Sequence, residues 1–543
     1  MAPEVEKHVP AFHPCVMLLK LELFRQSRDL KLKFGMETMT HWTQSSERQP
    51  RIAIIGAGMS GIAAVVKLRK AGYRDLTVFE KAEQVGGTWR ANRYPGLSCD
   101  VPSHWYSFTF NPNPDWTHRF SYGPEIQAYM QATADKFDVT PLVQFNTGVS
   151  ALAYDEEGED GPVWHLTTEH GDEEIFDIVI SATGILRLPQ LPDIKGLEGF
   201  TGTKFHSAEW PDNLDLSGKR VGIIGTGSTS CQIVGEITDK VGTMHVFQRT
   251  PHWVAPLPQK KYAGWQKFFM RALPFLPKLT YWINYLKFRA TFAPATSGQS
   301  PFWLKRFDQA CRDHLNEEIA DPDLRAKLTP DFTPMCKRLI FASDYFPALQ
   351  KDNCHLITEG IEHIDGDSVV TKDGARHELD VLILATGFDP SAFILPTRVI
   401  GKDGKDLGEF WGRAPRAHRG VTLPGFPNFW MIEGPTSPVG NLSLIMISEH
   451  QVDYIISMLD NMRASSVRAL APKQQAYEDY NADLAKAAQN TVWVTGGCDS
   501  WYIDASGLPN LYSHEPQRYL RDMHTLDLQE YEMSPRVNRL AAE

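Results

Sequence analysis

The sequence predicts an α/β fold with two Rossmann-like dinucleotide-binding domains and a helical insertion in the second. Two stretches, 51–81 and 219–248, each run from an apolar strand through a glycine-rich turn into a helix and a second strand. Two further apolar strands end in Ala-Thr-Gly, at 182–184 and 385–387. With 543 residues, the chain also exceeds what one hydrophobic core usually holds, so more than one domain is expected.

The composition is that of an ordinary globular protein, with 42% apolar and 22% charged residues. Lys and Arg total 55 against 66 Asp and Glu, and the net charge of -11 gives no general reason to expect a nucleic-acid partner. No run reaches the roughly 20 clean apolar residues of a membrane span, and no secretory signal pattern occurs. We therefore expect a cytoplasmic protein.

The cysteines predict neither a disulfide framework nor a zinc site. There are seven, an odd number, and no CxxC pair occurs among them. A reducing cytoplasm is the simplest location for such a protein. The cysteines occupy positions 15, 99, 231, 311, 336, 354 and 498.

The first glycine-rich turn has all the parts of a dinucleotide site. Gly56 permits the tight turn, and Gly58 lets backbone N–H groups approach a pyrophosphate at the positive end of the following helix. Gly61 allows the helix to pack closely on the strand. Glu80 ends the second strand, where a carboxylate accepts hydrogen bonds from a ribose diol. A lone GxGxxG would be weak support, but the flanking strands and the acid make this turn a specific signal.

The second turn predicts an NADPH site. Its third position is Ser230 instead of glycine, and a small residue still lets helix and strand pack. Arg249 and Thr250 stand where an NAD site would place its acid, and a cation with a hydroxyl suits a 2'-phosphate that a carboxylate would repel. The turn residues expected to contact the dinucleotide are Gly225, Gly227, Ser228, Thr229 and Ser230.

Two longer motifs carry a family resemblance. The first has the form FxGxxxHxxxW[PD] and is filled by Phe200, Gly202, His206, Trp210 and Pro211. The second has the form GxWxxxx[FY]P[GM]xxxD and is filled by Gly87, Trp89, Tyr94, Pro95, Gly96 and Asp100. In both respects the chain resembles the Baeyer–Villiger monooxygenases, class B flavoproteins of the flavin-containing monooxygenase superfamily. The resemblance covers roughly residues 50 to 515.

This resemblance implies a reaction. NADPH delivers hydride to FAD, which the first turn holds, and the reduced flavin reacts with O2 to give a C4a-peroxyflavin. That species attacks a ketone, and migration of one carbon yields an ester or lactone. The implied partners are therefore a ketone and O2.

The resemblance also implies site residues. The stretch 331–349 is similar to the family's loop in which a Lys-Arg pair faces nicotinamide and flavin, here Lys337 and Arg338. Arg338 would hold the peroxide as an anion, and Asp100 would orient Arg338. Trp501 would lie near the nicotinamide ribose, although a core aromatic is an equally good interpretation. The other residues expected near the cofactors are Thr88, Trp89, Tyr106 and, on the 2'-phosphate, Lys337 with Arg249 and Thr250.

His206 is expected to couple the domains rather than to transfer a proton, because a histidine between domains is more often a structural hydrogen-bonding group. We expect the motif at 200–211 to form the link between the FAD and NADPH halves.

Three other functions compete. A monooxygenase acting on sulfur or nitrogen shares the scaffold, but its relatives end the motif in a smaller aromatic than Trp210. A pyridine-disulfide reductase needs a CxxC or CxxxxC pair, which is absent. A non-catalytic flavoprotein would not need both Asp100 and Arg338.

The predicted domains follow from these elements. The stretch 258–306 is rich in aromatic and basic residues, which indicates either a helical insert packed on the nucleotide domains or a weak membrane-surface contact. The expected divisions are an N-terminal extension (1–49), an FAD-binding domain (50–190 and, with the tail, 376–543), an NADP-binding domain (191–257 and 321–375) and a helical insertion (258–320).

Overall fold

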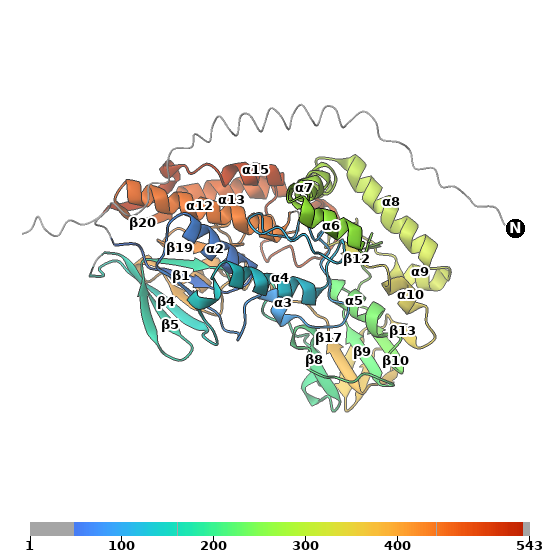
Figure 1. Cartoon of the computed structure of the whole chain (residues 1–543). Helices are drawn as coiled ribbons and strands as arrows, with labels where there is room; N and C mark the ends of the chain where they lie inside the picture. The colour runs from blue at the N-terminus through green and yellow to red at the C-terminus, as the bar shows by residue number, and fades with distance from the viewer. Residues whose placement is uncertain (1–47, 160, 441, 536–543) are drawn as a thin grey trace, which may run out of the picture. The chain divides into compact units, whose positions relative to one another are not determined.

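The computed structural model describes residues 48–159, 161–440 and 442–535. Residues 1–47, almost all of the expected N-terminal extension, lie outside the described residues. The chain from Gln49 onward forms one unit, whose elements are labelled in Figure 1.

The first sheet has five parallel strands in the order β19-β7-β1-β2-β3. Its central strand β1 is wholly apolar and buried, and β7 beside it is buried throughout, as expected where helices cover both faces of a parallel sheet. Helix α2 follows β1, and α12 packs beside α2. The elements are β1 (Ile52–Ile55), α2 (Met59–Lys70), β2 (Leu76–Phe79), β3 (Val143–Gln144), β7 (Ile178–Ser181), β19 (Phe429–Met431) and α12 (Leu444–Ala464).

The second sheet is also parallel and has the order β13-β10-β9-β17-β8. Helix α5 follows β9 as α2 follows β1. The elements are β8 (Thr203–His206), β9 (Arg220–Ile224), α5 (Ser228–Ile237), β10 (Thr243–Phe247), β13 (Cys354–Ile357) and β17 (Val381–Leu384).

Two sequence-based predictions about this sheet are wrong. The chain was expected to return to the first domain at residue 376, but β17 is hydrogen-bonded between β9 and β8. The motif at 200–211 was expected to be a linker, but its residues 203–206 are the edge strand β8. The apolar strand β17 and the four-residue strand β8 carry no local mark of the sheet that they join, so neither error could be seen in the sequence.

The two glycine-rich turns are built alike. Gly56 has φ +107°, and a Cβ there would lie 2.6 Å from the carbonyl oxygen of Ala182. Gly225 has φ +117°, and a Cβ there would lie 2.4 Å from the carbonyl oxygen of Ala385. The alanine of each Ala-Thr-Gly therefore closes against the first glycine of a turn, which explains why the tripeptide occurs twice.

Two chain segments cross between the sheets, and they pair with each other. The amide of Gln190 donates to the carbonyl of Gly387 (2.9 Å), and the amide of Asp389 donates to that of Leu188 (2.9 Å). The hydroxyl of Thr386 donates to the carbonyl of Gln190 (2.6 Å). The connection between the two halves is thus a two-stranded link and not a single flexible tether.

The helical insertion comes after β10 of the second sheet and the short strand β11 (Val254–Ala255). Helices α6, α7 and α8 lie within the expected range 258–320, and α9 comes directly after it (Figure 1). Their bounds are α6 (Gly264–Ala272), α7 (Phe275–Thr296), α8 (Pro301–Glu318) and α9 (Pro322–Leu328). Within the described ranges, no helix is both long and apolar enough to cross a membrane.

Smaller elements complete the unit. Antiparallel pairing joins β4, β5 and β6, with β18 alongside β4, and forms the sheet β14-β15-β16 and the pair β20-β21. Their bounds are β4 (Val149–Asp155), β5 (Val163–Thr168), β6 (Glu173–Phe176), β14 (Ile361–Asp365), β15 (Ser368–Thr371), β16 (Arg376–Glu378), β18 (Arg398–Ile400), β20 (Val467–Pro472) and β21 (Tyr531–Pro535). The remaining strands and helices are β11 (Val254–Ala255), β12 (Ile340–Phe341), α3 (Thr88–Ala91), α4 (Gly123–Lys136), α10 (Tyr345–Leu349), α11 (Leu407–Trp411), α13 (Gln474–Ala488), α14 (Val492–Thr495) and α15 (Pro516–Asp522).

A buried carboxyl group lies where α12 packs on α2. The hydroxyl of Ser448 on α12 donates to Glu433 Oε1 (2.9 Å) and lies 3.0 Å from the hydroxyl of Ser60 on α2. Only 2% of Glu433 is exposed. Burial raises the pKa of Glu433 to about 8, because the low-dielectric interior disfavours its charged form.

This shift makes stability depend on pH. The folded protein holds the proton of Glu433 more tightly than the unfolded chain, so stability is complete below the unfolded pKa of about 4.5 and falls as pH rises towards 8. Between pH 5 and 8, the native protein should lose on the order of 3 kcal/mol of unfolding free energy that the Glu433→Gln variant does not lose. Unfolding midpoints over this range, with the exposed Glu359→Gln as control, should give a flatter profile only for the first variant. Parallel profiles would contradict the assignment.

Candidate functional site

Asp100 and Arg338 form a bidentate ion pair. Nε of Arg338 donates to Asp100 Oδ2 (3.0 Å), and Nη2 donates to Oδ1 (2.7 Å) and Oδ2 (2.6 Å). The two residues are 238 positions apart in the sequence. The carboxylate raises the pKa of Arg338 further above its ordinary value. The side chain of Arg338 remains 38% exposed, so a permanent cation is fixed in one orientation and is still reachable.

A tyrosine that sequence analysis missed also contacts this pair. The Tyr502 side chain is close enough to Arg338 to interact with its charge and is almost fully buried (3% exposed). Burial raises the pKa of Tyr502, so it is a neutral partner for the guanidinium. Its position next to Trp501 was the signal in the sequence that could have identified it.

One pair of cysteines is bonded, contrary to the sequence-based prediction. Cys336 and Cys498 form a disulfide with their Cα atoms 6.1 Å apart. The bond joins the segment carrying Lys337 and Arg338 to the segment carrying Trp501 and Tyr502. Because 162 residues separate the two cysteines, spacing could not reveal the pairing. The pair is neither CxxC nor CxxxxC, so it does not restore the reductase hypothesis.

The remaining cysteines of the described chain are free and buried: Cys99, Cys231, Cys311 and Cys354. The cytoplasmic location was inferred in part from unpaired cysteines. It stays a prediction, with less support than before.

The loop from Gly87 to Asp100 bridges the two glycine-rich turns. At its start, a Cβ on Gly87 would lie 3.0 Å from the Cα of Gly58 in the first turn. At its middle, Tyr94 Oη donates to Gln232 Oε1 on α5 (3.1 Å). A Cβ on Gly96, where φ is +80°, would lie 2.6 Å from the carbonyl oxygen of Gln232. Asp100 therefore ends a loop that is fixed at both dinucleotide turns.

The first turn fits a bound FAD. Helix α2 begins after Gly58 with no side-chain cap, which leaves its first-turn N–H groups available to a pyrophosphate. A Cβ on Gly61 would lie 2.0 Å from the carbonyl oxygen of Gly56, so the helix and the turn touch as expected. Glu80 is buried and accepts from the amides of Ala57 (2.8 Å) and Ala82 (2.9 Å). Each carboxylate oxygen keeps a further lone pair for a ribose hydroxyl.

Three more predicted FAD contacts lie together. Helix α3 begins at Thr88, and Trp89 Nε1 donates to Tyr106 Oη (3.0 Å). The two rings meet edge to face with centroids 5.7 Å apart. The bridging loop is thereby anchored on the side of the first turn.

The second turn fits an NADP. Helix α5 begins at Ser228, again with no side-chain cap, and a Cβ on Gly227 would meet no atom within 4 Å. Thr229 Oγ1 lies 3.4 Å from Tyr94 Oη. Ser230 is fully buried, which explains why only a small residue fits at the third position.

The structure brings the predicted phosphate-binding cations together. Arg249 is exposed after β10, and the hydroxyl of Thr226 in the turn donates to the carbonyl of Thr250 (2.8 Å). Burial lowers the pKa of Lys337, while the nearby charges of Asp499 and Arg249 act on it in opposite directions. Binding of the 2'-phosphate by Arg249 and Lys337 stays a prediction.

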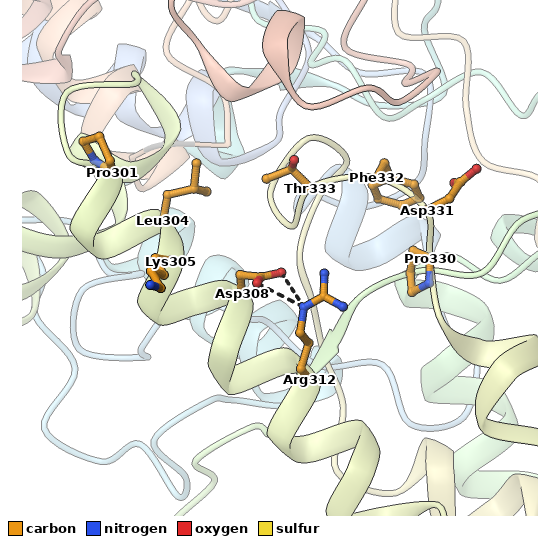
Figure 2. Close-up of a pocket in the computed structure, with 9 residues that line it drawn as sticks. All are labelled: Pro301, Leu304, Lys305, Asp308, Arg312, Pro330, Asp331, Phe332 and Thr333. Atoms are coloured by element: carbon orange, nitrogen blue, oxygen red, sulfur yellow. Dashed lines mark hydrogen bonds and ion pairs between the residues drawn. The ribbon is translucent and has the colours of Figure 1, made fainter. Parts of the chain in front are cut away.

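A groove of about 550 Å³ adjoins Lys337. Figure 2 shows α8 on one side and the 330–333 segment on the other, with Arg312 paired to Asp308. Lys337 Nζ lies 5.0 Å from the centre of the Phe332 ring, which lines the groove. The lining residues are Pro301, Leu304, Lys305, Asp308, Arg312, Pro330, Asp331, Phe332 and Thr333.

The motif at 200–211 holds the second sheet and the linkers in place. A Cβ on Gly202 would lie 2.6 Å from the carbonyl oxygen of Asp380, and Trp210 packs on Phe205 with centroids 5.1 Å apart. His206 is buried at the end of β8, and its ring packs edge to face on Phe388 of the returning linker (5.6 Å). Burial lowers the pKa of His206, so the imidazole is neutral at neutral pH. Phe200, at the start of the motif, is also buried, and Pro211, at its end, is partly exposed.

Trp501 is 40% exposed and packs on Tyr502 in a tilted arrangement, with ring centroids 4.3 Å apart. The interpretation of Trp501 as a core aromatic is therefore wrong. A partly exposed indole beside the Arg338 cluster is consistent with a cofactor contact, which stays a prediction.

Known proteins resemble this chain over most of its length. Residues 49–279 match the family of flavin-binding monooxygenase-like proteins. A Baeyer–Villiger monooxygenase of Streptomyces coelicolor is 40% identical over 489 residues, covering 89% of this chain and 92% of the relative. One of Pseudomonas aeruginosa is 38% identical over 471 residues, covering 86% and 87%. An uncharacterized monooxygenase of Mycobacterium tuberculosis is 42% identical, covering 90% and 96%.

Solved structures agree. A cyclohexanone monooxygenase from Rhodococcus sp. Phi1 bound to NADP+ superposes with a TM-score of 0.79 at 28% identity, covering 90% of this chain and all of that one (100%). OTEMO in complex with FAD and NADP gives a TM-score of 0.80 at 25% identity, with the same coverage of 90% and 100%. The two glycine-rich turns, the bridging loop and these likenesses agree on one assignment. The chain belongs to the Baeyer–Villiger monooxygenase family of flavin monooxygenases.

Proposed function

We propose that this protein is an FAD-containing, NADPH-dependent monooxygenase that inserts one oxygen atom of O2 beside a ketone carbonyl and releases an ester or lactone. The observation that carries the proposal is the bidentate pair of Asp100 and Arg338 at the end of the loop that bridges both dinucleotide turns. A fixed cation at this junction suits a reaction in which negative charge develops between flavin and nicotinamide.

When bound, FAD would supply the chemistry of hydride acceptance and oxygen activation. Arg338 stays protonated at any relevant pH and offers directed donors to an oxyanion. Asp100 fixes the plane of the Arg338 guanidinium group. Tyr502, on the segment that also carries Trp501, lies against the same group. These contacts hold the N–H donors of Arg338 in place, so the donors need not reorient when negative charge develops on the reacting oxygen.

The cations near the second turn select the reductant. Arg249, Thr250 and Lys337 would bind the 2'-phosphate of NADPH, which NADH lacks. Free N–H groups at the start of α5 would bind the pyrophosphate.

A ketone panel tests the proposed function. With NADPH and O2, ketone-stimulated NADPH oxidation should yield esters that mass spectrometry detects. Oxygenation of sulfides or amines with no ester from any ketone would instead establish the heteroatom-oxygenating alternative.

Arg338→Ala should uncouple or stop oxygenation while FAD remains bound. Loss of a fixed donor to the oxyanion is expected to lower ester formation by about 100-fold or more, and any remaining NADPH oxidation should produce hydrogen peroxide. The flavin spectrum, peroxide and ester are measured together. Arg398→Ala, at a mostly exposed arginine (73% of the side chain), is the control. Ester formation at the native rate in Arg338→Ala would contradict the role.

Arg249→Ala should weaken selection for NADPH over NADH. We expect KM for NADPH to rise by roughly 10- to 100-fold with KM for NADH nearly unchanged, because only the phosphate contact is lost. Arg376→Ala, which removes an exposed ion pair to Asp365, serves as control. An undiminished preference for NADPH would refute the assignment of Arg249.

A further inference from the structure

The outer surface of α6 and α7 is strongly apolar. Among the described residues, most of the large hydrophobic side chains that are exposed lie on this insertion. Three of them, Trp265 (65%), Phe268 (62%) and Phe302 (64%), are about two-thirds exposed. We name the surface of α6, α7 and the residues between them the insert face, and its members are Trp265, Phe268, Phe269, Leu273, Phe275, Leu279, Trp282 and Ile283.

The insertion divides its aromatics between two faces. On the inner side of α7, Tyr281 and Tyr285 are buried, and Phe288 packs on Trp105 with centroids 4.9 Å apart. The expectation that the aromatics of the insert pack on the nucleotide domains is therefore correct for this side alone. Residues such as Leu279 and Trp282 lie on the outer side, about half exposed. Helix α6 has no buried residue at all.

Charge distinguishes the insert face from the rest of the protein. No acidic residue occurs between Asp239 and Asp308, although the whole chain carries a net charge of -11. Within the described ranges, two basic side chains of this stretch make ion pairs, Lys240 to Glu236 (2.7 Å) and Arg271 to Asp115 (2.5 Å). Besides Arg271, the exposed basic residues of the part 258–306 are Lys260, Lys261, Lys278, Lys287, Arg289, Lys305 and Arg306.

We propose that the insert face binds the surface of an anionic phospholipid membrane. Trp and Phe side chains enter the boundary between headgroups and acyl chains, and the surrounding lysines and arginines contact lipid phosphates. Helices α6 and α7 follow one another in the chain and are in contact, as Figure 1 shows. The attachment is peripheral and reversible.

Two other occupants fit less well. A second copy of the chain in a twofold dimer would set the basic surface against itself, and like charges oppose such an interface. A water-soluble partner protein would need an acidic surface with apolar centre, whereas anionic lipid supplies negative charge and an apolar interior at once. This proposal concerns where the protein is located, at a membrane surface, so it does not depend on the proposed oxygenation reaction.

Vesicle flotation of the FAD-bound full-length protein tests the proposal. Vesicles of phosphatidylcholine are compared with vesicles in which about one third of the lipid is phosphatidylglycerol, each at low and at physiological salt. We expect binding to the anionic vesicles, weakened by salt. A Trp265→Ser, Phe268→Ser, Phe275→Ser variant should lose about tenfold or more of this affinity. Lys278→Glu with Lys287→Glu should remove the preference for anionic lipid.

A matched control changes exposed apolar residues elsewhere. Leu191 and Ile175 are 57% and 42% exposed, and the Leu191→Ser, Ile175→Ser variant should bind like the native protein. The flavin spectrum of each variant confirms folding.

Absence of binding at low salt, or equal binding by native protein and the triple variant, would overturn the proposal. So would a lipid-free dimer that the triple variant abolishes, because a second copy would then occupy the face.

Discussion

The ion pair between Asp100 and Arg338 is the contact on which the proposed chemistry depends. Each partner comes from a segment anchored elsewhere: Asp100 ends the loop that contacts Gly58 and Gln232, and Arg338 follows a cysteine bonded to Cys498. A carboxylate and a guanidinium in bidentate contact fix both distance and plane. A small shift of either dinucleotide turn would therefore also move the guanidinium group of Arg338.

The two halves repeat one design. In each, an Ala-Thr-Gly strand closes against the first glycine of a turn, at Ala182 with Gly56 and at Ala385 with Gly225. The chain crosses between the halves twice, and the crossing segments are hydrogen-bonded to one another. His206, at the end of an edge strand, packs on the second crossing at Phe388. The motif at 200–211 therefore supports the segments that cross between the two sheets. Arg338, the cation of the candidate site, lies on a different segment.

Local chemistry made much of this predictable. The glycine turns and Glu80 were inferred from residue types and motif spacing, because a turn conformation or a charge requirement restricts which residues fit. The pairing of Asp100 with Arg338 was predicted from the family resemblance. Tyr502, Glu433 and the bond between Cys336 and Cys498 were missed. Their roles arise from contacts between segments far apart in the chain, which no local pattern encodes. For the same reason β17 was placed in the wrong sheet.

The most direct test of the central claim is a double-mutant cycle on the ion pair. Ester formation from one ketone is measured for the native enzyme, Asp100→Asn, Arg338→Gln and the double variant, each with FAD bound. If the two side chains act as one unit, the double variant should be no slower than Arg338→Gln alone, because Asp100 acts only by holding Arg338. Losses that multiply would contradict this account, since they would show that each residue contributes independently.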